Sequence, residues 1–476
     1  MKLTILGEPN LEFGTGARHV DPRHGITDYG PADAVNTAVR TIRAGIVGTP
    51  AAIQGLRRWL DRCRRPIEAK DSRLGHLFVP FPGFDPAAGF HSTLVWDSRL
   101  ERPIRERDLK RLEGLKAQDA INAALDLYLA ELDILDEEPG CDVILIARPE
   151  GLAERPQREA DPDAPWKKAP LPEPVDDFRA LLKARAMRYS RPIQIIRRTT
   201  WDPTYKPVAT EKPRLQDEAT RAWNLHTALY YKAGGVPWRL PRDPSDLTSC
   251  YVGVTFYRSG DNTTLETSVA QVFNQRGDGV IVRGASAKVS RHDRQPHLSR
   301  DDARNLLTDA LARYRGEHRT LPARVVLHKT SSYTPDEIAG FRAAADASDI
   351  DILELLWLPA SDPVRLFRSA DHPPLRGTLL SVDTRRHLLY TRGSVPFYGT
   401  YPGMYIPTPL PFRLVDTESS PERLAEELLA LTKMNWNQTQ LDGRLPITLR
   451  TADRVGEILR HLGPNDRPQG RYAFYM

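Results

Sequence analysis

Short apolar runs alternate with amphipathic stretches in the first half of the chain. Residues 142–147 and 192–196 are apolar runs with the length of buried strands. Between them, residues 177–188 place apolar side chains at helical spacing, and a further helix is expected from about residue 216 to residue 232. This order of strand, helix, strand and helix predicts a parallel sheet covered by helices.

The second half of the chain has a β-rich pattern followed by alternating helices and strands. It begins after Gly234 and Gly235, which form a natural helix stop. The elements expected along it are strands at residues 250–257, 264–273 and 279–282, a helix from about residue 299, a strand at residues 323–328, and helices that open at Thr334 and Ser420. This order suits an RNase-H-like α/β layer fold, and a generic mixed α/β domain fits the same pattern.

The segment of residues 149–175 interrupts the first half. It is rich in proline and charge and has almost no apolar pattern. Such a segment cannot bury enough apolar surface to offset the entropy that is lost on ordering. We therefore expect it to be a flexible insertion.

Composition narrows the class of protein. The chain has 476 residues, of which 40% are hydrophobic, so it can form two or three domains with sizeable cores. Its net charge of +5 favours polyanionic partners without requiring them. No apolar run approaches the roughly 18 to 20 residues of a membrane span, and no signal peptide is recognisable, so we expect a cytoplasmic protein without membrane contact. The three cysteines, Cys63, Cys141 and Cys250, are too far apart in sequence to indicate a disulfide framework or a structural zinc site.

Residues 224–240, NLHTALYYKAGGVPWRL, resemble the junction between the MID and PIWI domains of Argonaute proteins. Further pieces similar to that family occur in the family order and span nearly the whole chain: Phe13-Gly14, Tyr29-Gly30-Pro31, Lys183, Gln194, Asn435-Trp436-Asn437 and Pro446-Ile447-Thr448. The resemblance implies an α/β protein with a Rossmann-like MID domain and an RNase-H-like PIWI domain.

The resemblance also implies domain limits. The expected domains are an N-terminal segment at residues 1–50 that packs on PIWI, MID at residues 51–235 with the flexible insertion, and PIWI at residues 236–476. Because this length leaves no room for the N and PAZ domains of long Argonautes, the chain resembles the short prokaryotic form.

A site for the 5′ phosphate of a guide strand is a further implication. In the family, the MID domain holds this phosphate with cationic and amide side chains, and the corresponding residues here are Arg179, Lys183, Gln194 and Lys232. Arg179 and Lys183 are four residues apart and therefore share one helix face. Lysine and arginine supply charge and hydrogen-bond donors to an oxyanion. Two cations on one helix face are also typical of a plain solvated surface.

The resemblance implies a metal site and a nucleic-acid channel as well. In prokaryotic relatives a buried terminal carboxylate helps to coordinate a divalent cation at the guide phosphates, which implies a structural Mg²⁺ held in part by Met476. A packed apolar terminus explains the apolar residues 472–476 equally well. The expected channel residues in PIWI are Arg283, Lys288, Arg291 and Arg392.

Threonines occupy the positions that hold the catalytic metal ions in cutting Argonautes. Those enzymes bind two Mg²⁺ ions with carboxylates, activating water for an in-line displacement. Thr255, in Gly-Val-Thr, stands where the family has Gly-x-Asp, and Thr330 stands where a later aspartate follows a His-Arg pair. Because a neutral hydroxyl does not replace a charged oxygen ligand, we expect no nuclease activity and no enzymatic activity in this chain. Asp336 and Glu337 are expected to complement the dipole of a helix in its first turn.

Guide-directed binding without cutting is the function that the resemblance implies. The expected partners are a small guide RNA, complementary DNA of a plasmid or phage, and an APAZ-containing effector protein in a heterodimer that can oligomerise on activation. Among possible effectors, a Sir2 NADase is favoured, with a TIR NADase next and a nuclease third. Once activated, the effector would serve antiviral and anti-plasmid defence, in the case of an NADase by depleting NAD. Two alternatives stay open. One is an autonomous guide-dependent nuclease with rearranged carboxylates such as Asp336 or Asp278, and the other is an α/β enzyme for a small phosphorylated metabolite.

Overall fold

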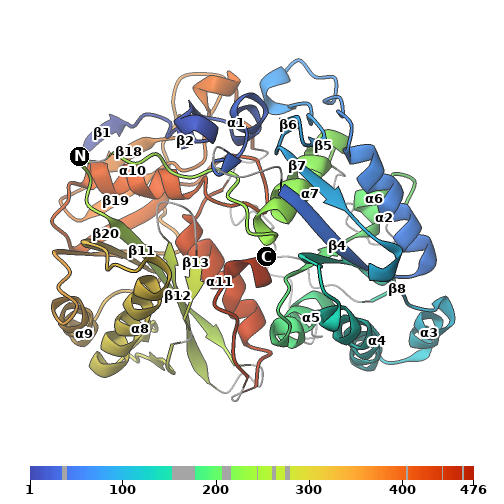
Figure 1. Ribbon diagram of the computed structural model, residues 1–476. Coiled ribbons are helices and arrows are strands. Elements are labelled where there is room, and N and C mark those ends of the chain that lie inside the picture. The colour runs from blue at the N-terminus through green and yellow to red at the C-terminus, as the bar shows by residue number, and fades with distance from the viewer. Residues whose placement is uncertain are drawn as a thin grey trace.

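Two large β-sheets, one of five and one of nine strands, organise the chain, as Figure 1 shows. The computed structural model describes residues 1–34, 40–152, 177–205, 216–243, 245–259, 264–273, 279–282, 284–403, 406–441, 443–463 and 466–476. Residues 153–175 of the expected flexible insertion and the expected channel residue Arg283 lie outside the described residues.

The described elements have the following bounds. The strands are β1 Lys2–Ile5, β2 Leu11–Glu12, β3 Arg18–His19, β4 Arg40–Gly48, β5 Phe84–Asp85, β6 Ala88–Gly89, β7 Ser92–Val95, β8 Glu101–Pro103, β9 Val143–Ala147, β10 Ile193–Ile196, β11 Ser249–Arg258, β12 Leu265–Phe273, β13 Gly279–Ile281, β14 Lys288–Val289, β15 Pro296–His297, β16 Arg324–Lys329, β17 Ile352–Trp357, β18 Thr378–Ser381, β19 Arg386–Leu389 and β20 Leu410–Asp416. The α-helices are α1 Pro22–Tyr29, α2 Pro50–Cys63, α3 Glu106–Lys110, α4 Ala117–Glu137, α5 Phe178–Arg185, α6 Arg198–Trp201, α7 Glu218–Lys232, α8 Arg300–His318, α9 Pro335–Asp346, α10 Pro421–Leu431 and α11 Ile447–Leu459.

The five-stranded sheet has the order β10-β9-β4-β7, with β8 also paired to β4, and all of these pairs are parallel. Helices α2 and α4 pack against β4. The strands β9 and β10 and the helices α5 and α7 confirm the four elements expected from the apolar pattern. A parallel sheet with covering helices is the Rossmann-like arrangement. The pattern does not predict β4, which lies before residue 50 in sequence but belongs to this sheet.

The nine-stranded sheet has the order β1-β18-β19-β20-β17-β16-β11-β12-β13. Neighbouring strands β11, β12 and β13 are antiparallel, whereas β11, β16 and β17 run parallel. Helix α8 packs on β12 and β13, and α11 packs on β11 and β12. These antiparallel strands, followed by alternating helices and strands, confirm the order expected for an RNase-H-like fold.

Side-chain hydrogen bonds cap the first turns of helices α9 and α10, which follow strands of the nine-stranded sheet. The Thr334 hydroxyl accepts a hydrogen bond from the N–H of Glu337, and the Glu337 carboxylate accepts one from the N–H of Thr334, at 3.2 and 2.9 Å. Pro335 occupies the first helical position, so the expected capping box is confirmed. Ser420 caps α10 in the same way by accepting from the N–H of Arg423.

The first residues of the chain belong to the nine-stranded unit. Strand β1 pairs antiparallel with β18, and Leu3 lies opposite Leu380. Farther along, the carboxylate of Glu8 lies between Arg376 and Lys433, at ion-pair distances of 2.9 and 3.1 Å. Burial alone would raise the pKa of Glu8, but the two cations outweigh it and lower the pKa. The segment before β4 is therefore fastened to the nine-stranded unit.

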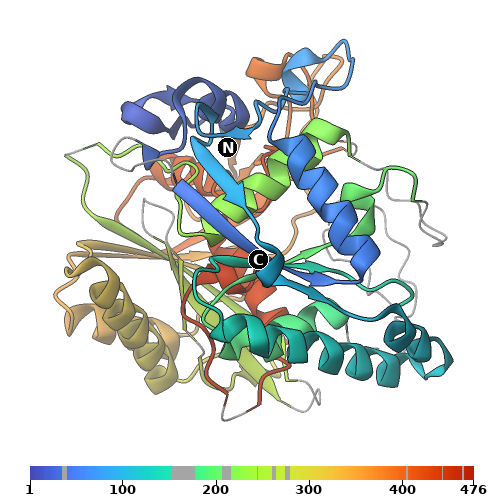
Figure 2. The ribbon, with the colours of Figure 1, turned by 45° about the vertical axis from the view of Figure 1, so that its right-hand side comes forward.

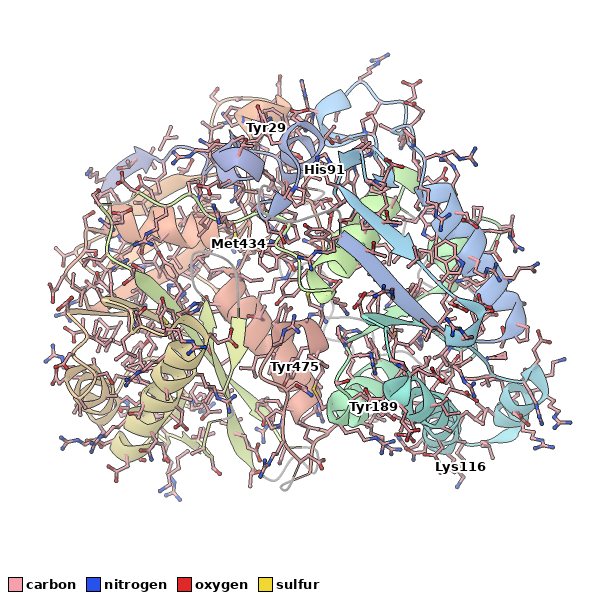
Figure 3. All side chains as sticks on the ribbon, in the orientation of Figure 1. Tyr29, His91, Lys116, Tyr189, Met434 and Tyr475 are labelled. Atoms are coloured by element: carbon pink, nitrogen blue, oxygen red, sulfur yellow. The ribbon has the colours of Figure 1, made fainter. Side chains whose placement is uncertain are left out.

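One cluster of buried apolar side chains joins the two sheets. It includes Ile42 and Leu145 of the five-stranded sheet and Val326 and Leu355 of the nine-stranded sheet. The last residues of the sequence lie between the two units in both ribbon views (Figures 1 and 2), and Figure 3 places Tyr475 there. Within the described ranges, no helix combines the length and the apolar character needed to cross a bilayer.

Candidate functional site

Elements α5, α7 and β10 bring four of the expected site residues together. Arg179 and Lys183 lie one turn apart on α5, Lys232 is the last residue of α7, and Gln194 lies on β10. Asp177 caps α5 by accepting a hydrogen bond from the main-chain N–H of Arg179. We call Arg179, Lys183, Gln194 and Lys232 the cationic site.

Both lysines of the cationic site are buried, Lys183 with 2% and Lys232 with 1% exposure. The Nζ of Lys232 donates to the carbonyl oxygen of Ile193 at 2.7 Å and to the main-chain oxygen of Met476 at 3.1 Å. The Nζ of Lys183 donates to the carbonyl oxygen of Phe474 at 3.4 Å. No aspartate or glutamate side chain in the described ranges forms an ion pair with either lysine.

The electrostatics of the cationic site are unfavourable for the protein alone. Burial lowers the pKa of Lys183 well below its ordinary value, and the charges of Lys232 and Arg179 lower it further. Burial and the charge of Arg179 also lower the pKa of Lys232. Buried charges of one sign are costly unless an opposite charge compensates them. The arrangement is therefore suited to an anion, which would restore the charged form of both lysines.

Gln194 adds an unused acceptor to this site. Its amide nitrogen donates to the carbonyl oxygen of Ile195 at 3.2 Å, whereas its buried Oε1 has no hydrogen-bond partner in the described part of the chain. Buried polar atoms are normally paired. The free Oε1 is able to accept a hydrogen bond from a donor group of a ligand.

Arg454 on α11 is a neighbour of the cationic site that the sequence does not predict. Its charge helps burial to lower the pKa of Arg179, and its guanidinium pairs with Glu457 at 3.3 Å. Arg454 lies more than 200 positions after Lys232 and comes from the other unit. Only packing of α11 on α5 brings it close, so no local pattern could have found it.

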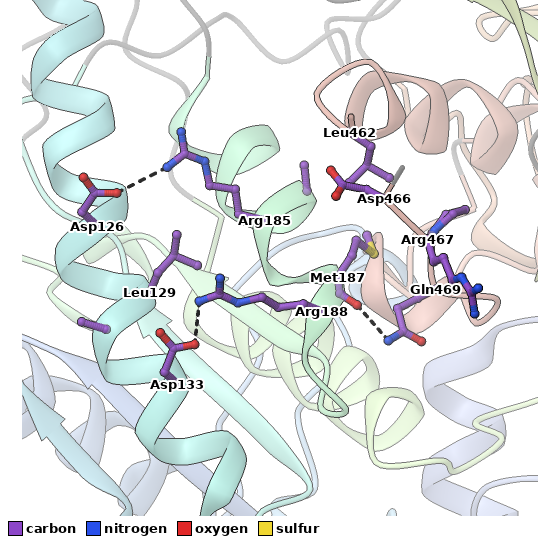
Figure 4. Close-up of a pocket in the computed structure, with 13 residues that line it drawn as sticks. Asp126, Leu129, Asp133, Arg185, Met187, Arg188, Leu462, Asp466, Arg467 and Gln469 are labelled. Atoms are coloured by element: carbon purple, nitrogen blue, oxygen red, sulfur yellow. Dashed lines mark hydrogen bonds and ion pairs between the residues drawn. The ribbon is translucent and has the colours of Figure 1, made fainter. Parts of the chain in front are cut away.

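A cavity of about 840 Å³ lies beside the other face of α5 (Figure 4). Two of its arginines are paired with acids of α4: Arg185 with Asp126 at 3.4 Å and Arg188 with Asp133 at 2.6 Å. Other lining residues come from α4, the end of α5, the 3-10 turn that follows it and the segment after α11: Leu129, Ala130, Ala184, Met187, Leu462, Asp466, Arg467, Pro468 and Gln469. Because Asp126 and Asp133 already compensate Arg185 and Arg188, this cavity is less suited to an anion than the cationic site.

The two threonines at the expected catalytic positions lie side by side. Strands β11 and β16 are parallel neighbours with Val254 opposite Lys329, and the N–H of Thr330 donates to the carbonyl oxygen of Val254 at 3.3 Å. Thr255 is buried, and its hydroxyl has no hydrogen-bond partner in the described ranges. We call the carboxyl ends of β11, β16 and β17 the carboxyl edge of the sheet.

Of the acids near this edge, Glu337 has other partners, Asp336 is exposed, and Asp278 lies outside the described residues. Glu337 completes the capping box, pairs with the buried Lys329 at 2.9 Å and contacts His297 at 3.2 Å. Asp336 is exposed in the first turn of α9, as expected. Asp278 lies outside the described residues. His328 donates or accepts a hydrogen bond with the Thr448 hydroxyl at 2.9 Å and is buried.

The expected channel residues are distributed over two parts of the nine-stranded unit. Lys288 is exposed on β14, and Arg291 is exposed in the turn that joins β14 to β15. Arg392 follows β19. Their grouping into one channel stays a prediction.

Comparison with solved structures identifies the fold as Argonaute-like. Over 99% of this chain, it matches a Clostridium butyricum Argonaute bound to a guide DNA and a 19-mer target DNA, with a TM-score of 0.66 and 13% identity. It also matches Aa-Ago with externally bound siRNA over 99% of the chain, with a TM-score of 0.59 and 14% identity. The expected fold, a Rossmann-like MID domain with an RNase-H-like PIWI domain, is thereby confirmed.

The likeness covers only part of those proteins. The matched regions are 54% and 55% of the two solved chains, so this chain spans about half their length. No protein-family model and no curated protein matches the sequence.

Proposed function

We propose that the cationic site binds the 5′ phosphate of a small guide RNA, which directs the chain to complementary DNA. The observation that carries this proposal is the buried pair Lys183 and Lys232, beside Arg179, without a paired aspartate or glutamate. A terminal phosphate carries about 1.5 to 2 negative charges at neutral pH and has several strong acceptor oxygens. It therefore matches the three cations of this site, and the second N–H of the Gln194 amide is available to donate to it.

The Argonaute-like fold supports the nucleic-acid part of the proposal. The two solved relatives are described with guide DNA, target DNA or siRNA. In guide-directed recognition, base pairing selects the target, while the protein holds phosphates and helical shape. We assign that second role to the channel residues Arg283, Lys288, Arg291 and Arg392.

A structural Mg²⁺ at the guide phosphates is part of the proposal. The main-chain oxygen of Met476 is a hard oxygen ligand of the kind that Mg²⁺ prefers, and it lies in contact with Lys232. The neighbouring lysines oppose a metal ion on its own, so the ion fits this site together with the phosphates. When bound, Mg²⁺ would offset phosphate charge. Chelation by EDTA should then weaken binding of a 5′-phosphorylated guide.

In this proposal, the chain binds its target DNA without cutting it. Thr330 directly follows β16, and Thr255 lies in the C-terminal half of the neighbouring strand β11. Both offer hydroxyls at the positions that, by the family resemblance, are aspartates in cutting Argonautes. If the chain only binds the target, a second protein is needed to respond to that binding. We therefore propose a heterodimer of the short Argonaute form with an APAZ-containing effector, a Sir2 or TIR NADase or a nuclease, that serves defence in the cytoplasm.

The nucleic acids that copurify with the chain test this function. The expected result is small RNA with a 5′ phosphate, bound much more tightly than the same RNA with a 5′ hydroxyl. Equal affinity for the two guides would overturn the phosphate assignment. Target cutting with Mg²⁺ or Mn²⁺ would instead favour the autonomous nuclease, and a bound phosphorylated metabolite without nucleic acid would favour the metabolic enzyme.

Effector activation needs a separate measurement. The chain and the proteins that copurify with it are incubated with guide and complementary DNA, and NAD consumption and DNA breakdown are followed. The proposal expects one of these activities to rise only when the target matches the guide. A copurifying partner whose activity ignores the target would contradict the effector part alone.

A further inference from the structure

The loop between β17 and β18, residues 358–377, presents an aromatic ring to solvent. The side chain of Phe367 is 78% exposed, whereas that of Tyr29 is 42% exposed. A single exposed apolar side chain is common on protein surfaces, so exposure alone does not define a binding site. Two further features indicate a binding site: the loop holds this ring in place, and positive charges lie near it in sequence.

Hydrogen bonds fix the main chain on the N-terminal side of Phe367. The N–H of Leu366 donates to the Tyr390 hydroxyl at 2.7 Å, and the N–H of Val364 donates to the Asp362 carboxylate at 3.0 Å. Asp362 is in turn paired with Arg386 of β19 at 2.8 Å. The ring therefore projects from a segment that is anchored to the sheet, and little freedom is lost when it meets a ligand.

Two arginines flank the ring without acidic partners. The guanidinium of Arg365 donates to the carbonyl oxygens of Asp362 and, at 2.9 Å, Val364. The guanidinium of Arg368 donates to the carbonyl oxygen of His372 at 2.9 Å and to the Ser394 hydroxyl at 3.5 Å. Neither arginine forms an ion pair with a carboxylate in the described ranges.

The charge balance of this loop is positive. Asp362 is compensated by Arg386, which leaves the exposed Asp371 against Arg365 and Arg368. Phe367 consequently lies, in sequence, between two arginines in a loop whose charge attracts anions.

The loop starts at the carboxyl edge of the nine-stranded sheet. Strand β17 is parallel to β16, so its end lies beside the end of β16, which Thr330 follows, and Thr255 lies on the next strand, β11. The guanidinium of Arg444 donates to the carbonyl oxygen of Ala360 at 2.7 Å and ties the beginning of the loop down there. The hydrogen bond from Arg368 to Ser394 also connects the loop to the segment that contains the channel residue Arg392, two residues before Ser394.

We propose that Phe367 stacks on a nucleobase of the nucleic acid held along the carboxyl edge, while Arg365 and Arg368 contact its phosphates. This inference rests on the proposed function and assigns it a base-contacting residue. Aromatic rings interleaved with cations are the arrangement that proteins use for unpaired strands, because every base has a flat face and every nucleotide a phosphate. Bases within a duplex already stack on their neighbours, so the partner of Phe367 is an unpaired or terminal base of the guide or target.

A protein partner fits the same loop less well. Aromatic anchors of protein interfaces are enclosed in desolvated apolar pockets. Arginine is also common at such interfaces, but there the partner must supply a matching counter-charge. Phe367 instead has a guanidinium one or two residues away on either side. The charge pattern therefore favours a polyanion over an apolar pocket.

Base stacking can be measured with 2-aminopurine, a fluorescent base that dims when it stacks. Complexes are assembled from the full chain, a 5′-phosphorylated guide RNA and complementary DNA, with 2-aminopurine at successive positions of each strand. The expected result is one position, or two adjacent ones, whose emission rises in Phe367→Ala and stays low in Phe367→Trp. Dissociation of that strand should become about tenfold faster in Phe367→Ala. Tyr29→Ala, which removes another exposed ring, is the matched control and should change neither quantity.

The outcomes separate this inference from the proposed function. If the guide binds with its dependence on the 5′ phosphate intact, but no position brightens in Phe367→Ala, the stacking assignment is wrong and the proposed function stands. Unchanged emission combined with loss of a copurified protein in Phe367→Ala shows a protein contact and also overturns it. If the wild-type chain ignores the 5′ phosphate, the proposed function fails first. A brightening in Phe367→Ala under those conditions still supports the stacking contact, and no brightening overturns it.

Discussion

The two faces of α5 carry positive side chains in opposite electrostatic settings. On one face Lys183 is buried without a paired aspartate or glutamate in the described ranges, and its pKa is depressed by burial and by like charges. On the other side, Arg185 at the end of α5 and Arg188 in the 3-10 turn that follows border a cavity and pair with Asp126 and Asp133. The number of positive residues therefore does not locate an anion site. The lack of compensating acids does, because only there does an arriving anion remove an existing cost.

The nine-stranded unit offers a third setting. Lys329 is as buried as Lys183, but it pairs with the buried Glu337 at 2.9 Å. Burial lowers its pKa, whereas the charge of Glu337 raises it. The two lysines thus differ mainly in the counter-charge, which makes them a natural pair for mutational comparison.

The largest expected effect concerns guide binding. Lys183→Met with Lys232→Met should weaken binding of a 5′-phosphorylated guide RNA by about 3 to 6 kcal/mol, at least 100-fold, because each charged hydrogen bond contributes about 1.5 to 3 kcal/mol. Arg185→Met with Arg188→Met on the other face is the matched control, and its affinity should stay within about threefold. Fluorescence polarisation at one fixed salt concentration measures both. Equal losses in the two double variants would remove the distinction between the faces.

The second prediction concerns the compensated lysine. Glu337→Gln should lower the free energy of unfolding by about 3 to 5 kcal/mol, because it leaves Lys329 buried without its counter-charge. Glutamine can still complete the capping box, so the variant isolates the effect of the charge. Asp336→Asn changes the neighbouring exposed acid and should cost less than about 1 kcal/mol. Urea unfolding followed by circular dichroism compares the two. A similar small cost for both variants would show that Lys329 does not depend on Glu337.

The third prediction is a substitution that raises the free energy of unfolding, by an amount that depends on pH. Because burial lowers the pKa of Lys183, the unfolded chain binds more protons at this residue, so its destabilising effect is complete below the folded-state pKa and disappears by the ordinary value of about 10.4. Guide-free Lys183→Met should therefore be more stable than wild type near pH 6, by about 1 to 4 kcal/mol, with a difference that shrinks as pH rises. Unfolding curves from pH 6 to 10 test this, and a difference that grows with pH would contradict it.

Guide binding should follow from the same shift. A bound phosphate favours the charged lysines, so binding takes up protons and the affinity should fall between pH 7.5 and 9.5, by up to about tenfold per pH unit for each proton. The double lysine variant should lose this slope. Retention of the full slope in that variant would assign the proton uptake to other groups.

The smallest effect is expected for an exposed pair. In Arg188–Asp133 both side chains are more than half exposed, at 56% and 55%. Arg188→Met should lower the free energy of unfolding by less than about 1 kcal/mol, since exposed ion pairs are screened by water and salt. The measurement is again urea unfolding, at low and at high salt. A cost above that of Glu337→Gln would reverse the order proposed for the three settings.

Local patterns predict most of the elements but not how they pair. The elements β9, α5, β10 and α7 follow from apolar runs, helical spacing and helix stops, which are properties of short segments. Strand β4 escapes prediction because Arg40 and Arg43 interrupt its apolar pattern. Its place beside β9 arises from pairing with residues about a hundred positions later.

The candidate site divides in the same way. The spacing of Arg179 and Lys183 shows that they share a helix face, and the family resemblance adds Gln194 and Lys232. Compensation is invisible in the sequence, because Asp126 lies 59 positions before Arg185. Likewise, only the folded chain places the carbonyl oxygen of Phe474 against Lys183. Which positive residues lack a counter-charge is therefore a property of the tertiary structure.

The pairing of β1 with β18 has a consequence for how the chain reaches its fold. Leu3 and Leu380 are neighbours in the sheet, yet they are separated by 377 positions. At a synthesis rate of 5 to 20 residues per second, the first strand emerges from the ribosome about 20 to 75 seconds before its partner. Contacts between such distant positions slow folding, and an unpaired strand is prone to misassociation meanwhile. A chaperone that shields the nascent N-terminus should therefore raise the yield of active protein.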